Sequence, residues 1–176
     1  MLHVSDDSVL VLVDFQARLM PVIHEGASVV AQAVRLARIA QLVGVPVVGT
    51  EQSPLQLGRN VPDIKDLCSD TVVKDHFDAC ADGLVDALPP ARNTVVVAGC
   101  EAHVCVLQTA FGLLRGGRKV TVVSDAVGSR RTFDRDAGIA RLGAAGVQIA
   151  TVEMLGFEWL GSSRHPRFRE VLRLIK

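Results

Sequence analysis

The sequence contains few aromatic residues and no excess of either charge. It has six Phe, one Trp and no Tyr, and its 19 basic and 19 acidic residues give a formal net charge of zero. Proteins that bind nucleic acid usually present a basic patch that neutralises phosphates, and often aromatic side chains on which bases stack. The composition therefore disfavours a nucleic-acid partner.

Long apolar runs and paired cysteine motifs are also missing. No uncharged apolar stretch reaches the length of about 18 residues that indicates a membrane-spanning helix, so we expect no membrane partner. No C-x-x-C pair or Cys/His spacing typical of a metal site occurs among the four cysteines, which are Cys68, Cys80, Cys100 and Cys105. The chain begins without a charged segment followed by an apolar run and a cleavage site. We therefore expect a cytoplasmic protein with reduced thiols.

The length and composition fit one globular domain. The chain has 176 residues, and we assign residues 1–176 to a single domain. Hydrophobic residues make up 49% and charged residues 22% of the chain, which excludes a disordered protein. A chain of this length buries a substantial core without disulfide or metal links.

Short β-branched runs alternate with helical patterns along the chain. The run from Val9 to Asp14 (VLVLVD) is almost entirely apolar, which is typical of a strand buried on both faces of a parallel sheet. Further strands are predicted at 45–49, 71–73, 94–98, 119–123 and 147–150, and helices at 27–43, 81–88, 104–115, 134–145 and 166–175. This alternation predicts an α/β fold with a doubly wound, mostly parallel sheet and helices on both faces. The longest irregular stretch, residues 51–70, is a candidate pocket wall.

Cys105 stands where a reactive cysteine would be expected in such a sheet. It follows a strand and a short turn, at the first turn of a predicted helix. Free N–H groups and the helix dipole at that position stabilise a thiolate, and in a reaction they stabilise an oxyanion. We therefore expect a lowered thiol pKa and a nucleophile, the alternative being a small buried apolar residue.

Asp14 and Lys74 also lie at the carboxyl ends of predicted strands, where ligands bind in α/β sheets. Asp14 either faces a ligand or forms a turn bond to the following backbone. Lys74 on its own is more typical of a solvated edge residue. Together with Cys105, however, they provide what a thiol hydrolase needs: Asp14 would accept the thiol proton, and Lys74 would hold the acid and favour charged forms.

Other polar residues are weaker candidates. Gln16 and Gln52 would hydrogen-bond a substrate carbonyl or amide, or are ordinary loop residues. Glu101 is more typical of a structural carboxylate held by backbone donors than of a catalytic group. The arginines at 130–135 are expected to be solvated or at a subunit contact.

Several motifs in the chain resemble the isochorismatase-like cysteine hydrolases. They are V-D-F-Q at 13–16, T-E-Q-S-P at 50–54, V-K at 73–74, A-G-C-E-A-H-V-C-V at 98–106, S-D-A at 124–126 and the terminal H-P-R-F. The resemblance covers nearly the whole chain. Within the superfamily it is closest to the subgroup of isochorismatase domain-containing proteins.

The resemblance implies a six-stranded parallel sheet, a Rossmann-like three-layer sandwich, and a catalytic triad of Asp14, Lys74 and Cys105. It also implies a cis peptide bond between Cys100 and Glu101. That bend would direct backbone N–H groups near Glu101 and at Cys105 toward an oxyanion. Cys100 and Glu101 are therefore candidate oxyanion or substrate residues.

Three departures from the family pattern narrow the expected chemistry. Nicotinamidases of this superfamily bind a metal through an Asp and two His after the second strand, but here that region has no His, so we expect neither a metal nor another cofactor. Isochorismatases proper often lack the cysteine, because cleavage of an enol ether needs an acid, so Cys105 argues against that substrate. Many relatives read Phe-Ser-Ala-Phe where this chain has F-D-A-C at 77–80, so the specificity contacts of that loop are not carried over.

The leading hypothesis is a metal-independent hydrolase that cleaves a small amide-type C–N bond through a Cys105 thioester. Two alternatives stay open: an enol-ether hydrolase driven mainly by Asp14, and a non-catalytic binding or scaffold protein. The expected partners are a small-molecule substrate and, as is common in the family, further copies of the chain in a homo-oligomer.

Overall fold

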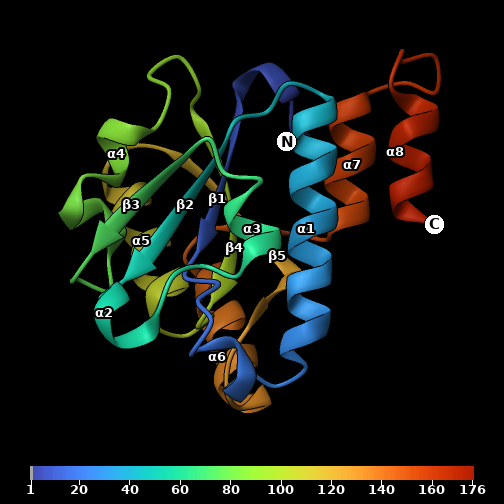
Figure 1. Ribbon diagram of the computed structural model, residues 1–176. Helices are drawn as coiled ribbons and strands as arrows, with labels where there is room; N and C mark the ends of the chain where they lie inside the picture. The colour runs from blue at the N-terminus through green and yellow to red at the C-terminus, as the bar shows by residue number, and fades with distance from the viewer. Residues whose placement is uncertain (1) are drawn as a thin grey trace.

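A computed structural model describes residues 2–176 and shows an α/β fold built on six parallel strands (Figure 1). The strands are β1 (Ser8–Val13), β2 (Val47–Gln52), β3 (Asp70–Lys74), β4 (Thr94–Cys100), β5 (Lys119–Gly128) and β6 (Gln148–Ala150). Their order in the sheet is β3-β2-β1-β4-β5-β6, and every neighbouring pair is parallel. The predicted doubly wound sheet is therefore confirmed.

Helices cover both faces of this sheet. One face carries α1 (Gly26–Leu42), α7 (Val152–Leu160) and α8 (Phe168–Ile175), which lie side by side on the right in Figure 1. The other face carries α4 (Leu84–Ala87), α5 (Cys105–Arg115) and α6 (Thr132–Ala144). The connections contain the short helices α2 (Pro54–Leu57) and α3 (Pro62–Lys65) and the 3-10 turns η1 (Ser5–Asp7), η2 (Met20–Val22) and η3 (Ala79–Asp82).

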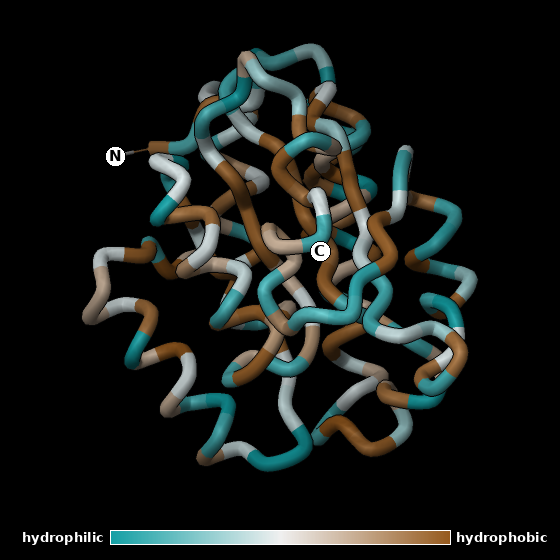
Figure 2. The backbone as a smooth tube through the Cα atoms, turned by 90° about the vertical axis from the view of Figure 1, so that its left-hand side faces the viewer, coloured by the Kyte–Doolittle hydropathy of each residue, from teal (hydrophilic) through white to brown (hydrophobic). Residues whose placement is uncertain are grey.

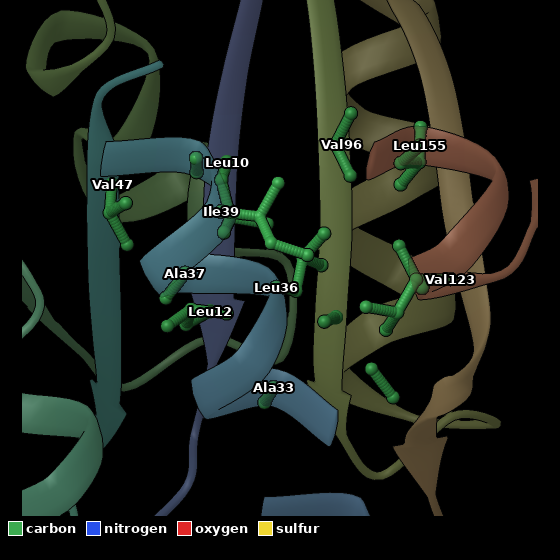
Figure 3. Close-up of a cluster of buried hydrophobic side chains, with 14 of the residues drawn as sticks. Leu10, Leu12, Ala33, Leu36, Ala37, Ile39, Val47, Val96, Val123 and Leu155 are labelled. Carbon is green, nitrogen blue, oxygen red and sulfur yellow. The ribbon is translucent and has the colours of Figure 1, made fainter. Parts of the chain in front are cut away.

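Strand β1 shows why the sheet is covered on both sides. All of its residues are buried, and successive side chains of a strand point to opposite faces. Leu10 and Leu12 lie with Leu36 of α1 in the buried cluster drawn in Figure 3, whereas Val9 and Val11 join the core under α4, α5 and α6. A continuous apolar run thus supplies both halves of the core, as the sequence pattern predicts.

The hydropathy of the chain follows these layers. Segments through the middle of the molecule are mostly hydrophobic, and the hydrophilic segments lie toward the outside (Figure 2). Among residues 2–176, no helix combines the length and apolar character needed to cross a membrane. The four cysteines are all free, in agreement with the expectation of reduced thiols.

The predicted helix at 81–88 is interrupted in the structure. Gly83 has a φ of 91°, in the left-handed region that glycine adopts without steric cost. It separates η3 from α4, so two short pieces replace one continuous helix. The prediction of one continuous helix was wrong because it did not treat Gly83 as a break.

Helix α7 was not predicted at all. Thr151 caps its first turn, since the hydroxyl oxygen accepts a hydrogen bond from the Met154 N–H at 3.3 Å. Val152, Leu155 and Trp159 are buried at helical spacing and pack with α1. The pattern of an amphipathic helix is therefore present in the sequence.

Strand β5 continues to Gly128, five residues beyond the predicted range 119–123. The register between β4 and β5 shifts between Val97 and Gly99. Gly99 has a φ of 136°, and a Cβ at this position would clash with the Val13 carbonyl oxygen. Glycine here lets β4 approach β1 closely at the point where the site begins.

Candidate active site

The candidate site lies where the strand order reverses, at the carboxyl ends of β1 and β4. Doubly wound sheets bind ligands at such a point. Asp14 directly follows β1, Lys74 is the last residue of β3, and Cys105 is the first residue of α5. The side chains meet there, and all three residues are buried, with exposed fractions of 0%, 1% and 8% respectively. The structure therefore brings together the three residues that the resemblance implies.

Asp14 is held in a left-handed backbone conformation with a φ of 52°, which is unusual for a residue other than glycine. Its Oδ1 accepts a hydrogen bond from the Thr50 hydroxyl at 2.6 Å. Its Oδ2 lies 2.8 Å from Lys74 Nζ, but no donor among residues 2–176 makes a well-directed hydrogen bond to it. Oδ2 is therefore a buried acceptor with capacity to spare.

Lys74 reaches this carboxylate from the edge strand β3. Its ammonium donates hydrogen bonds to Gln52 Oε1 at 2.7 Å and to the His76 carbonyl oxygen at 3.3 Å, in addition to its ion pair with Asp14. The side chain is completely buried. Burial of an ammonium is costly unless other groups replace its water, and these three oxygens do so.

Cys105 begins α5 after an irregular turn. The peptide bond between Cys100 and Glu101 is cis, as the resemblance implies. The Glu101 carbonyl oxygen accepts hydrogen bonds from the N–H groups of Val104 and Val106 at 3.0 and 3.2 Å. Within residues 2–176, the N–H groups of Glu101 and Cys105 have no hydrogen-bond partner. Two backbone donors are thus free at the turn that leads into α5.

The pKa of the Cys105 thiol is raised, whereas the sequence predicts a lowered value. Burial is the largest effect and the Asp14 carboxylate the next, and together they raise the pKa to about 12, although Lys74 lowers it. The expectation of a lowered thiol pKa is therefore wrong for the resting site, because one helix terminus and one ammonium do not offset burial beside a carboxylate. The thiol is protonated at neutral pH, so its use as a nucleophile requires a proton acceptor.

A cavity of about 300 Å³ opens onto this cluster. Its charged lining residues are Asp14, Arg18, Glu101 and Arg130. Apolar side chains form much of the remaining wall: Leu19, Val22, Leu57, Phe77 and Val104. Leu57 belongs to α2, within the segment 51–70 that was the candidate pocket wall.

The two candidate glutamines differ in their access to the cavity. Gln52 lines the cavity, with Oε1 bound to Lys74 Nζ and 3.9 Å from Cys105 Sγ. Gln16 does not line it: its Oε1 accepts from the Gln52 N–H at 2.8 Å, and its Nε2 donates to the carbonyl oxygens of Gln52 and Gly58 at 2.9 and 2.6 Å. Gln16 therefore positions Gln52 and does not meet a ligand directly.

Cys100 and Glu101 also separate. The Cys100 side chain is fully buried on the α1 side of the sheet and does not line the cavity, so this residue contributes only backbone to the site. Glu101 lines the cavity and accepts hydrogen bonds from the Arg130 N–H at 2.9 Å and from Arg130 Nε at 3.0 Å. Burial raises the pKa of Glu101, but the hydrogen bonds from Arg130 outweigh this and hold it below its ordinary value. Glu101 is thus a paired carboxylate, in line with its expected structural role.

Sequence reasoning assigned no role in the site to three further residues. Arg130 was expected only on a solvated or intersubunit face, yet it lines the cavity and binds Glu101. Thr50 holds Asp14, and its signal is a hydroxyl within the otherwise apolar start of β2. Arg18 lines the cavity from the loop after β1, and a basic residue four positions beyond Asp14 is the signal that could have found it.

No group of three or more His, Cys, Asp or Glu side chains in the described part of the chain is arranged to hold a metal ion. The independence from metal and other cofactors stays a prediction.

Comparison with known proteins identifies a family that the chain matches. The model of a family described as the isochorismatase domain matches residues 8–154. The chain is 36% identical over 171 residues to isochorismatase domain-containing protein 2 from Bos taurus, covering 96% of this chain and 83% of that protein.

Two solved structures share the fold over almost the full chain. One is a Caenorhabditis elegans protein named MAR1 ribonuclease, with a TM-score of 0.94, 34% identity and coverage of 99% of this chain and 92% of that one. The other is YcaC from Pseudomonas aeruginosa, solved with hexane-2,5-diol and covalent acrylamide, with a TM-score of 0.91, 25% identity and coverage of 98% and 91%.

Proposed function

This chain belongs to the isochorismatase family, and from this premise we propose that it hydrolyses a small amide-type C–N bond with Cys105 as the nucleophile. The observation that carries the proposal is the buried cluster of Asp14, Lys74 and Cys105 on one side of the cavity. A thiol, a carboxylate with a free acceptor and an ammonium are the groups that covalent amide hydrolysis requires.

In the first step, Asp14 Oδ2 accepts the thiol proton as the sulfur attacks the carbonyl carbon of the substrate. Formation of the S–C bond moves the carbonyl π electrons onto oxygen. The free N–H groups of Glu101 and Cys105 would donate to this oxyanion. Because the pKa of the resting thiol is raised to about 12, proton transfer accompanies attack and no thiolate is stored beforehand.

In the second step, Asp14 passes the proton to the leaving nitrogen, the C–N bond breaks and an acyl thioester remains on Cys105. Asp14 then removes a proton from water, whose oxygen attacks the thioester carbon. The thiol leaves with that proton and the carboxylic acid product forms, so all atoms balance. Throughout, the ammonium of Lys74 and the hydroxyl of Thr50 hold the Asp14 carboxylate in position.

The cavity favours a small substrate over a polymer. A volume of about 300 Å³ is at the lower end for small-molecule sites, and the zero net charge of the chain does not favour phosphate tracking. A ribonuclease activity, which the name of the C. elegans protein states for that protein, is therefore not our proposal here. The P. aeruginosa protein holds covalent acrylamide, an electrophile that thiols attack at its double bond, which supports a reactive nucleophile in a related site.

A panel of small aliphatic and aromatic amides, assayed for released amine, tests the proposal. We expect Cys105→Ala to lower turnover by about 10³-fold or more while the circular dichroism spectrum is unchanged. The matched control is Cys80→Ala, which alters a half-buried cysteine that does not line the cavity and should leave turnover at the parent value. Mass spectrometry after rapid acid quench should detect an acyl group on the Cys105 peptide.

The same variants separate the alternatives. An enol-ether hydrolase driven by Asp14 would lose activity in Asp14→Asn and keep it in Cys105→Ala. A binding or scaffold protein would turn over no substrate in any form. Parent-like amide turnover by Cys105→Ala would disprove the cysteine mechanism.

A homo-oligomer and a cytoplasmic location are part of the proposal. Three apolar side chains near the cavity support the oligomer, because Leu55, Val22 and Phe77 are 89%, 56% and 51% exposed. Sedimentation velocity at micromolar concentration tests it, and a monomer at all concentrations would contradict it.

A further inference from the structure

We infer that the cavity above Cys105 binds a ligand with a single negative charge, such as a carboxylate, and that Arg18 is the residue that selects it. The identity of the substrate rests on the proposed function: if that function is correct, the substrate is a small amide that also carries a carboxylate. The inference comes from the charges that line the cavity and from how each of them is partnered.

Both acidic groups that line the cavity are already neutralised. Asp14 Oδ2 lies 2.8 Å from Lys74 Nζ, and Glu101 Oε2 lies 3.0 Å from Arg130 Nε. Each pair sums to zero charge. Arg18 is the remaining charged lining residue, and no carboxylate within residues 2–176 lies within 4.0 Å of its guanidinium nitrogens. The cavity therefore carries one uncompensated positive charge.

The Arg18 side chain is held by the backbone of the neighbouring helix. Its Nη1 donates hydrogen bonds to the carbonyl oxygens of Leu55 and Gln56 at 3.2 and 2.9 Å, both in α2. Its Nε and Nη2 make no hydrogen bond to any residue in 2–176. An arginine fixed at one nitrogen, with its other donors free, is arranged to bind the two oxygens of a carboxylate.

The rest of the cavity limits the size and polarity of this ligand. Its volume is about 300 Å³, and apolar side chains from the loop after β1, α2 and the start of α5 form much of the wall, among them Leu19, Leu57 and Val104. A second negative charge would have no cation left to pair with. The geometry thus fits a small monoanion with an apolar linker that leads from Arg18 toward the thiol.

Iodoacetate and iodoacetamide provide a direct test, because they differ in charge and deliver the same carbon to sulfur. In both reactions the S–C bond forms, the C–I bond breaks, iodide leaves and the thiol proton is lost. The rate of each at Cys105 is followed by mass spectrometry of the Cys105 peptide. The thiol pKa and the openness of the pocket affect both rates equally. The ratio of the two rates therefore measures the preference for an anion.

We expect Arg18→Gln to lower the iodoacetate-to-iodoacetamide ratio about tenfold, as the loss of a charged hydrogen bond predicts. Arg18→Lys keeps the charge and should retain most of the ratio. Arg38→Gln is the matched control: Arg38 is an exposed arginine on α1 that does not line this cavity, so the ratio should stay at the parent value.

An unchanged ratio in Arg18→Gln, or an equal loss in Arg18→Lys, would overturn the inference, because the charge of Arg18 would then not select the ligand. An equal loss in Arg38→Gln would do the same by tracing the preference to overall charge. The test needs no turnover. A ratio that depends on Arg18 in a protein that hydrolyses no amide would refute the proposed hydrolase and leave the anion site standing.

Discussion

Each end of the sheet buries an acid–base pair, and the two pairs differ in what surrounds them. At the carboxyl end, Lys74 Nζ lies 2.8 Å from Asp14 Oδ2, beside the Cys105 thiol. At the amino end, His3 Nδ1 lies 2.5 Å from Glu158 Oε2, and His3 Nε2 lies 2.6 Å from the Thr121 hydroxyl. The chemistry of the partners is similar, so the surroundings of each pair decide whether it could take part in the proposed reaction.

The two ends also have cavities of comparable size. The amino-end cavity has a volume of about 360 Å³ and is lined in part by His3 and Asp7, against about 300 Å³ at the carboxyl end. Both carboxylate oxygens of Asp7 are hydrogen-bonded there: Oδ1 accepts from the Asn93 N–H at 3.0 Å and Oδ2 from the Thr94 hydroxyl at 2.8 Å. Unused hydrogen-bonding capacity next to a thiol, and not volume, distinguishes the candidate site.

Replacing Lys74 should have the largest effect, because it breaks the carboxyl-end pair. Lys74→Met leaves the Asp14 carboxylate buried without its cation, so we expect the free energy of unfolding to fall by about 3–5 kcal/mol. Urea denaturation measures this. The matched control is Lys65→Met on α3, an exposed lysine whose replacement should change stability by less than about 0.5 kcal/mol. Equal stability of the two variants would show that the buried pair is not a stabilising one.

The pH dependence of Cys105 alkylation tests the raised thiol pKa. Only the thiolate reacts with iodoacetamide, so the rate should rise about tenfold per pH unit between about pH 7 and pH 9 without a plateau. In Asp14→Asn the carboxylate that raises the pKa is gone, so alkylation at about pH 8 should become faster while amide turnover falls. A plateau below about pH 8 in the parent would instead indicate a thiolate formed in advance.

Breaking the amino-end pair should affect stability alone. Glu158→Gln removes the charged acceptor of the His3 imidazole, so we expect a loss of about 1–3 kcal/mol with turnover at the parent value. Glu153→Gln on the same helix, where the side chain is exposed, is the control and should be neutral. A drop in turnover per folded molecule in Glu158→Gln would mean that the two ends of the sheet are coupled.

The smallest expected effect concerns Glu101 and Arg130. Because the folded-state pKa of Glu101 is lowered, the pair contributes stability above the unfolded pKa of about 4.3, and this is lost as pH falls through the lower folded value. The Arg130 side chain is 61% exposed, so the contribution should stay below about 1 kcal/mol. The difference between the urea midpoints at pH 7 and at about pH 3.5 should be slightly smaller in Arg130→Gln than in the parent. In Arg131→Gln this difference should equal that of the parent. An identical pH dependence in both variants would show that the Glu101–Arg130 pair does not contribute to the pH dependence of stability.

The order of the elements could be predicted from the sequence because it depends on local patterns. The apolar run before Asp14 marks a strand covered on both faces, and parallel topology then brings the ends of separate strands together. The same logic placed Lys74 and Cys105 at one edge. Helix α7 could have been predicted in the same way, since Val152 and Leu155 have the spacing of a buried helix face.

What could not be predicted depends on contacts among several elements. The direction of the Gln16 amide, toward the backbone of Gln52 and away from the cavity, follows from how the loop after β1 lies on α2. The pKa of Cys105 follows from burial by at least two elements and from the distance to Asp14, neither of which a motif encodes. The pairing of Arg130 with Glu101 likewise joins residues that are far apart in the chain.

The origin of Lys74 in β3 has a consequence for the dynamics of the site. β3 is the outermost strand on its side of the sheet, where it pairs with β2 alone. Val73, beside the lysine, is 51% exposed. Edge strands open by local fluctuation at a lower free energy than central strands do. A transient detachment of β3 withdraws the ammonium from Asp14 while the central strands stay intact. We therefore expect that local opening of this edge strand changes the charge around the sulfur and interrupts the site without global unfolding.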